Sequence, residues 1–197
     1  MDEKLTWNSH ISQLCSKLTQ NIGILNKLRF LSQDVLKVIY HSFITSHISY
    51  CCIIWGFTSQ LNLKRIYILQ KRAIRIVTHS QYLCPTKPLF VKTKILSIYD
   101  MILLNTGNFM FSCYHSDLPQ SFRSYFNLNK MVHIYDTRNK NNFHPPLMRT
   151  EGTKLTIFYE GPVLWNKLPA NIKACKSLKH FKSSYKQVLL DMNKLTT

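Results

Sequence analysis

The chain has 197 residues, of which 26 are Lys or Arg and only 9 are Asp or Glu, so its formal net charge is +17. A hydrophobic fraction of 45% is that of a globular protein and excludes wholesale disorder, and the length allows one good-sized domain or two small ones. With 5 Gly residues and no Gly-rich phosphate-loop pattern, the sequence excludes the common nucleotide-binding loops. The excess of positive charge favours an anionic partner, such as RNA, DNA or a membrane surface.

Apolar residues recur every three or four positions in the first part of the chain and predict successive helices. The first helix is expected to begin near Thr6, and the second to be capped by Ser32. No Asp, Glu, Lys or Arg occurs from Val38 to Leu63, but the dense apolar block, residues 48–57, is shorter than the ~20 residues of a membrane-spanning helix. We therefore expect no membrane segment, and a buried helix that runs into a core strand or a turn. The residues expected to face the core are Trp7, Ile11, Leu14, Leu18, Ile22 and Leu25 in the first helix, and Val35, Leu36, Ile39, Phe43 and Ile48 in the second.

The segment 63–77, LKRIYILQKRAIRIV, separates into two faces when it is drawn as a helix. One face is apolar, and the other is a basic arc of roughly 120° that contains no carboxylate and only one apolar residue, Ile68. Two interpretations remain open for this arc: a surface for the phosphate backbone of a nucleic acid, or the solvated face of an ordinary amphipathic helix. The charge of the whole chain favours the nucleic acid. The cations of the arc are Lys64, Arg65, Lys71, Arg72 and Arg75.

Further helices are predicted downstream, where Thr86 is expected to cap a short helix that ends at Thr93. A long helix is predicted over 98–114, with Tyr99, Ile102, Leu103 and Met110 facing the core, and a short helical turn is predicted after Pro119. The final helix is expected to be capped by Ser177. The apolar side of that helix is expected to carry Leu178, Phe181, Tyr185, Val188 and Leu189.

Alternating residues in the last third predict two strands, over 133–138 and 155–160, with the loop NKNNFHPP between them. After the second strand, Gly161 and Pro162 are expected to start a helical turn over 163–168. The fold class is therefore predicted to be mainly α, with a helical bundle-like N-terminal two thirds and a small α+β or irregular C-terminal part. The expected domains are 1–126 and 127–197, which can also form one continuous domain. The three Trp residues, Trp7, Trp55 and Trp165, are all expected in the core.

The sequence lacks the local patterns of catalytic and metal sites. The six Cys residues include no C-x-x-C pair and are expected to be reduced and mostly buried, with His79–Cys84 and Cys113–His115 as the nearest approaches to zinc-ligand spacing. No two Asp residues are adjacent and no G-x-S-x-G occurs, so we expect no catalytic residue, no cofactor and no activity from this chain alone. Arg138 is expected either to form a salt bridge with Asp136 or Glu160, or to contact a phosphate.

Several local patterns occur in a fixed order: DEKLTWNSHI, GILNKLR, YCCIIWG, LKRIYILQKRAIRIV, PLF, YDTRN and YEGPVLWNKLPANIKACKSLKHFK. Their order and spacing, over residues 2–190, resemble the C-terminal part of the reverse transcriptase of LINE-type (non-LTR, jockey-like) retrotransposons. The resemblance implies a region that follows the polymerase palm and looks like the thumb and its connector. That family performs magnesium-dependent RNA-directed DNA synthesis, but the palm, its catalytic Asp pair and any endonuclease domain are missing here.

The resemblance therefore implies a truncated element fragment that grips nucleic acid and is inactive alone. The expected partners are RNA, DNA or an RNA–DNA hybrid, with a polymerase palm as a further partner and with no membrane. The alternatives are a protein-interaction domain that docks its basic and apolar helices on an acidic partner or a palm, an enzyme with dispersed carboxylates, and a remnant without function. An intracellular location is expected, with no choice between cytoplasm and nucleus. The expected nucleic-acid contacts are Lys64, Arg65, Lys71, Arg72, Arg75 and Arg138.

Overall fold

The computed structural model describes residues 6–115, 117–132 and 138–195. The chain forms two compact units: unit 1 comprises residues 1–102 and 188–197, and unit 2 comprises residues 103–187. Helices make up both units, which confirms the predicted mainly α fold. Over the described ranges there is no strand, only an isolated bridge between Leu128 and Phe143. The domain boundary expected near residue 127 lies inside unit 2.

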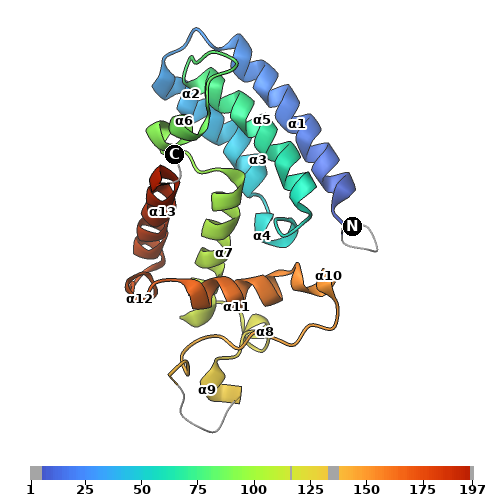
Figure 1. Ribbon diagram of the computed structural model, residues 1–197, viewed down its shortest axis with the longest axis vertical. Coiled ribbons are helices and arrows are strands. Elements are labelled where there is room, and N and C mark those ends of the chain that lie inside the picture. Colours follow the sequence, from blue (N-terminus) through green and yellow to red (C-terminus); the bar gives the residue numbers. More distant parts are fainter. Residues whose placement is uncertain (1–5, 116, 133–137, 196–197) are drawn as a thin grey trace. The chain divides into compact units, whose positions relative to one another are not determined.

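Unit 1 is built around two long helices that lie side by side, α1 and α5 (Figure 1). Hydrogen bonds join Asn62 to Asn8 near the helix starts and Arg29 to Ser80 just beyond the helix ends, so the two helices run parallel. Two further helices, α7 and α13, each pass from one unit into the other. The elements that begin in unit 1 are α1 (Asn8–Lys27), α2 (Gln33–Tyr40), the π-helical turn η1 (His41–Thr45), α3 (Ser46–Ser49), α4 (Cys52–Trp55), α5 (Gln60–Val77), α6 (Lys87–Thr93) and α7 (Ile98–Tyr114).

The first helix begins one residue later than a Thr6 cap would place it. Trp7 is the N-cap residue and has a left-handed backbone, with φ 60°, so α1 begins at Asn8. Trp7 is half-buried, whereas Trp55 and Trp165 are fully buried as predicted. Most of the predicted apolar face of α1 is in the core: Ile11, Leu14, Leu18 and Leu25 are buried and Ile22 is half-buried.

The predicted core face of the second helix is partly wrong. Val35 and Phe43 are exposed, at 45% and 42%. The π-helical turn η1 lies between α2 and α3 and takes more residues per turn than an α-helix. Residues that are four positions apart therefore face the same, buried side of the segment from α2 to α3. The segment continues into a turn and α4 rather than into a strand. The residues that are buried at this spacing are Leu36, Tyr40, Ile44 and Ile48.

A buried glutamine joins three elements of unit 1. Gln70, on α5, is 0% exposed, and its Nε2 donates to the Tyr40 hydroxyl and to the Leu96 carbonyl, both at 2.9 Å. Its Oε1 accepts a hydrogen bond from the Ile98 backbone N–H at 2.8 Å, at the first residue of α7. Burial raises the pKa of the Tyr40 hydroxyl, which stays a neutral partner. One amide side chain thus satisfies groups of α2, the 94–97 connection and α7.

Ser59 caps the first turn of α5, where its Oγ accepts a hydrogen bond from the Asn62 backbone N–H at 3.4 Å. Replacing Ser59 with Ala is expected to lower the free energy of unfolding by about 1 kcal/mol, because the N–H loses its partner. Urea denaturation of both proteins measures the difference. The exposed Ser9 on α1 provides the matched control, and Ser9→Ala is expected to change stability by less than about 0.5 kcal/mol. Equal losses for the two variants would contradict a capping role for Ser59.

Unit 2 has an aromatic core. The rings of Phe111, Trp165 and Phe181 pack together, with centroids 4.8 Å apart for Phe111–Phe181 and 5.9 Å for Trp165–Phe181. Gly161 lies beside Met110, and a Cβ at Gly161 would come within 2.7 Å of the Met110 sulfur. The helices that begin in unit 2 are α8 (Gln120–Arg123), α9 (Asn129–Val132), α10 (Glu151–Lys154), α11 (Ile157–Lys167), α12 (Ala170–Lys173) and α13 (Leu178–Leu195).

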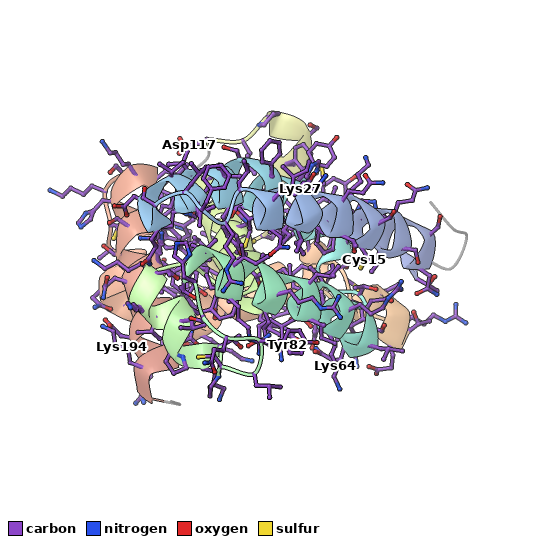
Figure 2. The ribbon with its side chains drawn as sticks, turned by 90° about the horizontal axis from the view of Figure 1, so that it is seen from above. Cys15, Lys27, Lys64, Tyr82, Asp117 and Lys194 are labelled. Carbon is purple, nitrogen blue, oxygen red and sulfur yellow. The ribbon has the colours of Figure 1, made fainter. Side chains whose placement is uncertain are left out.

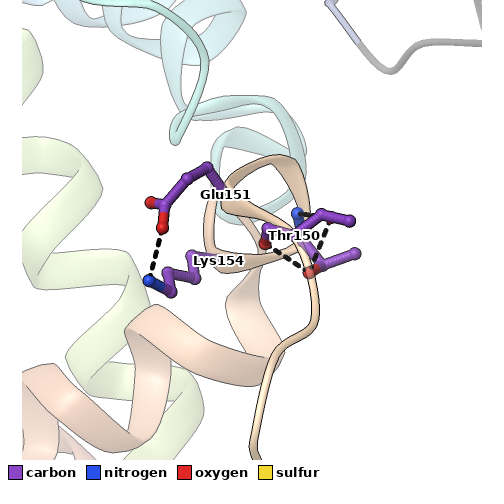
Figure 3. Close-up of polar contacts among 4 residues, drawn as sticks. Thr150, Glu151 and Lys154 are labelled. Atoms are coloured by element: carbon purple, nitrogen blue, oxygen red, sulfur yellow. Dashed lines mark hydrogen bonds and ion pairs between the residues drawn. The ribbon is translucent and has the colours of Figure 1, made fainter.

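The strand predicted over 155–160 is wrong, because helix α11 begins at Ile157. Thr150 accepts a hydrogen bond from the Thr153 backbone N–H at the start of α10 (Figure 3). Thr156, whose backbone is extended, is the N-cap residue of α11. The alternation that suggested a strand therefore covers the C-cap of α10, the extended N-cap residue Thr156 and the first turn of α11. The predicted helical turn at 163–168 is the second half of α11. The other predicted strand falls largely on residues 133–137, outside the described ranges.

Candidate nucleic-acid interface

Helix α5 separates into the two faces that the sequence predicts. Leu63, Ile66 and Ala73 are buried, while Lys64, Arg65 and Arg72 are exposed. Figure 2 shows Lys64 on α5 and Cys15 on the neighbouring α1. The helix is therefore held by its apolar side and presents cations on the other.

The basic face borders α1 at Arg65. The Arg65 Nη2 donates to the Ser12 hydroxyl of α1 at 3.2 Å, so this guanidinium is held against α1 while its side chain stays exposed. Burial raises the pKa of the Cys15 thiol, also on α1, and the nearby positive charge of Arg65 opposes that shift. Arg65 is thus an oriented cation beside a hydroxyl, an arrangement that suits a phosphate oxygen.

The remaining two cations of α5 are half-buried and pack on aromatic rings. The Lys71 Nζ lies 5.0 Å from the centroid of the Tyr67 ring, and Tyr67 stacks on Phe90 of α6. The Arg75 Nε donates to the Cys84 carbonyl at 3.0 Å, and its guanidinium lies 5.9 Å from the centroid of Tyr82. Arg75 therefore holds the 80–90 segment against α5, while Lys71 packs on a ring of its own helix. Both side chains are less available to a binding surface than the exposed cations.

An apolar ridge divides the basic face. At 100° per residue, Leu61 and Ile68 fall between the Arg65–Arg72 side and the Lys64 side of the helix. Both are exposed, at 73% and 40%. The surface of α5 thus presents two lines of positive charge with apolar side chains between them.

Arg138 lies apart from α5 in the chain, in a turn of unit 2, and its side chain is exposed. No ion pair joins Arg138 to Glu160, since the described ion pairs are Lys154–Glu151 and Lys194–Asp191. Asp136, the other expected partner, lies outside the described ranges. The contact of Arg138 with a phosphate stays a prediction.

The described part of the chain holds no group of three or more His, Cys, Asp or Glu side chains that could bind a metal ion. All six cysteines are free, but only Cys52 and Cys175 are buried, so the prediction of mostly buried thiols is wrong. Cys113 is partly buried, and burial raises the pKa of its thiol to about 12, which makes it a poor nucleophile. Among the described helices, none is both long and apolar enough to cross a membrane.

Sequence reasoning missed two contributors to this surface, Ser12 and Tyr82. Ser12 is 53 positions before Arg65 in the chain, and only the parallel packing of α1 on α5 brings them together. Tyr82 is 73% exposed. Its cation–π contact with Arg75, seven positions earlier, is visible only once the chain turns back after α5.

Comparison with known proteins links part of the chain to transposon polymerases. The chain is 25% identical over 106 residues to a protein of Drosophila melanogaster described as a probable RNA-directed DNA polymerase from transposon X-element. The matched region is 52% of this chain and 12% of that protein, so the chain spans a small part of its relative. No protein-family model matches the chain. No solved structure matches it either. These findings support a relationship with a retrotransposon reverse transcriptase.

Proposed function

We propose that the chain is a fragment of a LINE-type reverse transcriptase that corresponds to the thumb and connector after the palm, and that it binds nucleic acid without catalysing synthesis alone. The observation that carries this proposal is the solvent face of α5, where Lys64, Arg65 and Arg72 are exposed and no carboxylate lies among them. The partial match to a transposon polymerase supports the same partner.

The proposed mechanism is a grip on the phosphate backbone of an RNA–DNA hybrid, RNA or DNA. Each cation that neutralises a phosphate releases a counterion, so binding weakens steeply as salt rises. Arg65, oriented by Ser12, is expected to make a directed contact, and Lys64 and Arg72 to act as neighbouring charges. Phosphates carry no base sequence, so this surface is expected to tolerate all sequences.

Binding of the purified chain to a labelled RNA–DNA hybrid across a salt series tests the proposal. Heparin at the same charge concentration serves as the comparison polyanion. The expected result is a steep linear fall of log K with log salt and tighter binding to the hybrid than to heparin. Absence of binding, or equal binding to heparin, would contradict a retained thumb. A magnesium-dependent primer-extension assay is expected to give no product, and extension by this chain alone would contradict the proposed lack of activity.

A second function is favoured by the ridge of Leu61 and Ile68, which places exposed apolar side chains among cations. Such a surface also suits an acidic protein partner or a polymerase palm, because protein interfaces combine an apolar centre with a charged rim. Leu61→Ser and Ile68→Ser together distinguish the two functions. Binding to the hybrid is expected to survive this double replacement, whereas a protein interface would lose its centre.

A further inference from the structure

Unit 2 contains an aromatic pocket that the surface of α5 does not explain. The pocket has a volume of about 270 Å³, and its walls include the rings of Tyr114, Phe122, Phe126 and Phe143. Sites for drug-sized ligands measure about 300–1,000 Å³, so this pocket suits a single small ring system.

The aromatic rings of the pocket differ in exposure: the buried rings form its floor, and an exposed ring lies at its mouth. Phe126 and Phe143 are 7% and 1% exposed, with centroids 6.4 Å apart and planes at 76°. Phe122 and Met131 are 43% and 70% exposed, so they lie where the pocket opens to solvent. A flat ring that enters at the mouth therefore meets aromatic faces and edges inside.

Cations gather next to this mouth. Lys130 precedes Met131 in the chain, and its backbone N–H donates to the Lys140 carbonyl at 3.0 Å. The Asn129 Nδ2 donates to the Asn139 carbonyl at 2.9 Å, which fixes the turn of Arg138 and Lys140 on the segment that forms the pocket wall. The side chains of Lys130, Arg138 and Lys140 are all exposed.

We propose that this pocket receives one unpaired base of a single-stranded nucleic acid, while Lys130, Arg138 and Lys140 contact the neighbouring phosphates. Aromatic rings beside a basic track are the two elements that proteins use to bind single strands without sequence preference. The choice of a nucleic acid rests on the proposed function, but the site is independent of α5. In this proposal Arg138 contacts a phosphate together with two neighbouring cations, Lys130 and Lys140.

Positive charge around the pocket favours this occupant over an apolar protein side chain. Residues 113–143, the span that provides the pocket walls, contain four Lys or Arg and two carboxylates, so a partner that brings negative charge together with a flat ring is favoured. A nucleotide combines both within one unit. Since the walls provide rings and apolar groups, the base is expected to be held by stacking, with little discrimination among bases.

Two oligomers of equal length and charge test the site in the full chain: a single-stranded oligonucleotide, and its abasic analogue without bases. The wild-type chain is expected to bind the base-containing oligomer about 5- to 100-fold more tightly, since base stacking on an aromatic side chain has that effect. Phe122→Leu, which keeps an apolar side chain but removes the ring at the mouth, is expected to remove most of this preference. Tyr125→Leu is the matched control, because Tyr125 is also exposed but does not line the pocket.

Circular dichroism and the intrinsic fluorescence of the three Trp residues, of which Trp55 and Trp165 are buried, report whether the variants keep their fold. Equal binding of the two oligomers by the wild type would overturn the proposal, as would a base preference that persists in folded Phe122→Leu. The same oligomers with a variant that lacks Lys64, Arg65 and Arg72 separate this proposal from the proposed function. Base preference retained without hybrid binding supports the pocket alone, and hybrid binding without base preference supports α5 alone.

Discussion

Replacing Lys64, Arg65 and Arg72 with Gln is expected to flatten the salt dependence of hybrid binding by about two to three units of log K per unit of log salt. Each phosphate contact on a B-form duplex contributes about 0.9 to this slope, and all three side chains are exposed on α5. The decrease in affinity is expected to be largest at low salt. Titration of the labelled hybrid at several salt concentrations gives both slopes.

Lys71 and Arg75 are left in place in this design because they pack on Tyr67 and Tyr82, and their removal would disturb the fold. The matched control replaces three other exposed lysines, Lys176, Lys179 and Lys182, and removes the same charge from unit 2. The control variant is expected to keep most of the wild-type slope of log K against log salt. Equal flattening by both variants would mean that diffuse positive charge, rather than the surface of α5, binds the hybrid.

Replacing Gln70 with Leu is expected to lower the free energy of unfolding by about 2 to 6 kcal/mol. The replacement keeps a similar volume but removes both donated bonds and the accepted one, so the Leu96 carbonyl and the Ile98 N–H lose a buried partner. Each buried polar group left without a partner costs about 1–3 kcal/mol. Since a domain is stable by about 5–15 kcal/mol in total, this loss is large. Denaturation followed by circular dichroism measures it.

Gln13 is the matched control for this replacement, because it is an exposed glutamine on α1. Gln13→Leu is expected to change the free energy of unfolding by less than about 0.5 kcal/mol. A Gln70→Leu protein as stable as the wild type would show that the buried amide does not organise α2, α5 and α7.

Much of the helical fold could be predicted because its signals are local. Helix 98–114 has the predicted limits, and Thr86 and Ser177 precede helices as expected. Ser177 accepts a hydrogen bond from the His180 backbone N–H. Phe43 was wrongly placed in the core because it lies in a π-helical turn, which changes the residue spacing without a sequence signal of its own. The false strand arose where the chain leaves α10 and starts α11 through the extended residue Thr156, so that the alternation crosses a helix boundary.

Only the part of the candidate site that lies on a single helix could be predicted from the sequence. The basic arc of α5 is a local pattern, and three of its cations are exposed as such a surface requires. The bond between Arg65 and Ser12, and the buried partners of Gln70, join residues far apart in the chain. Periodicity describes one helix at a time and therefore carries no information on these pairs.

The last residues of the chain belong to the first unit, and this has a consequence for synthesis. Leu189 and Leu190 are buried, and the Asn193 side chain donates to Asp100 at 2.8 Å within unit 1. A ribosome makes the N-terminal residues first, so helices α1 to α6 emerge long before α13. A nascent chain that has reached residue 187 holds nearly all of unit 1 but lacks its closing residues. Unit 1 therefore completes its core only after unit 2 has been synthesised in full.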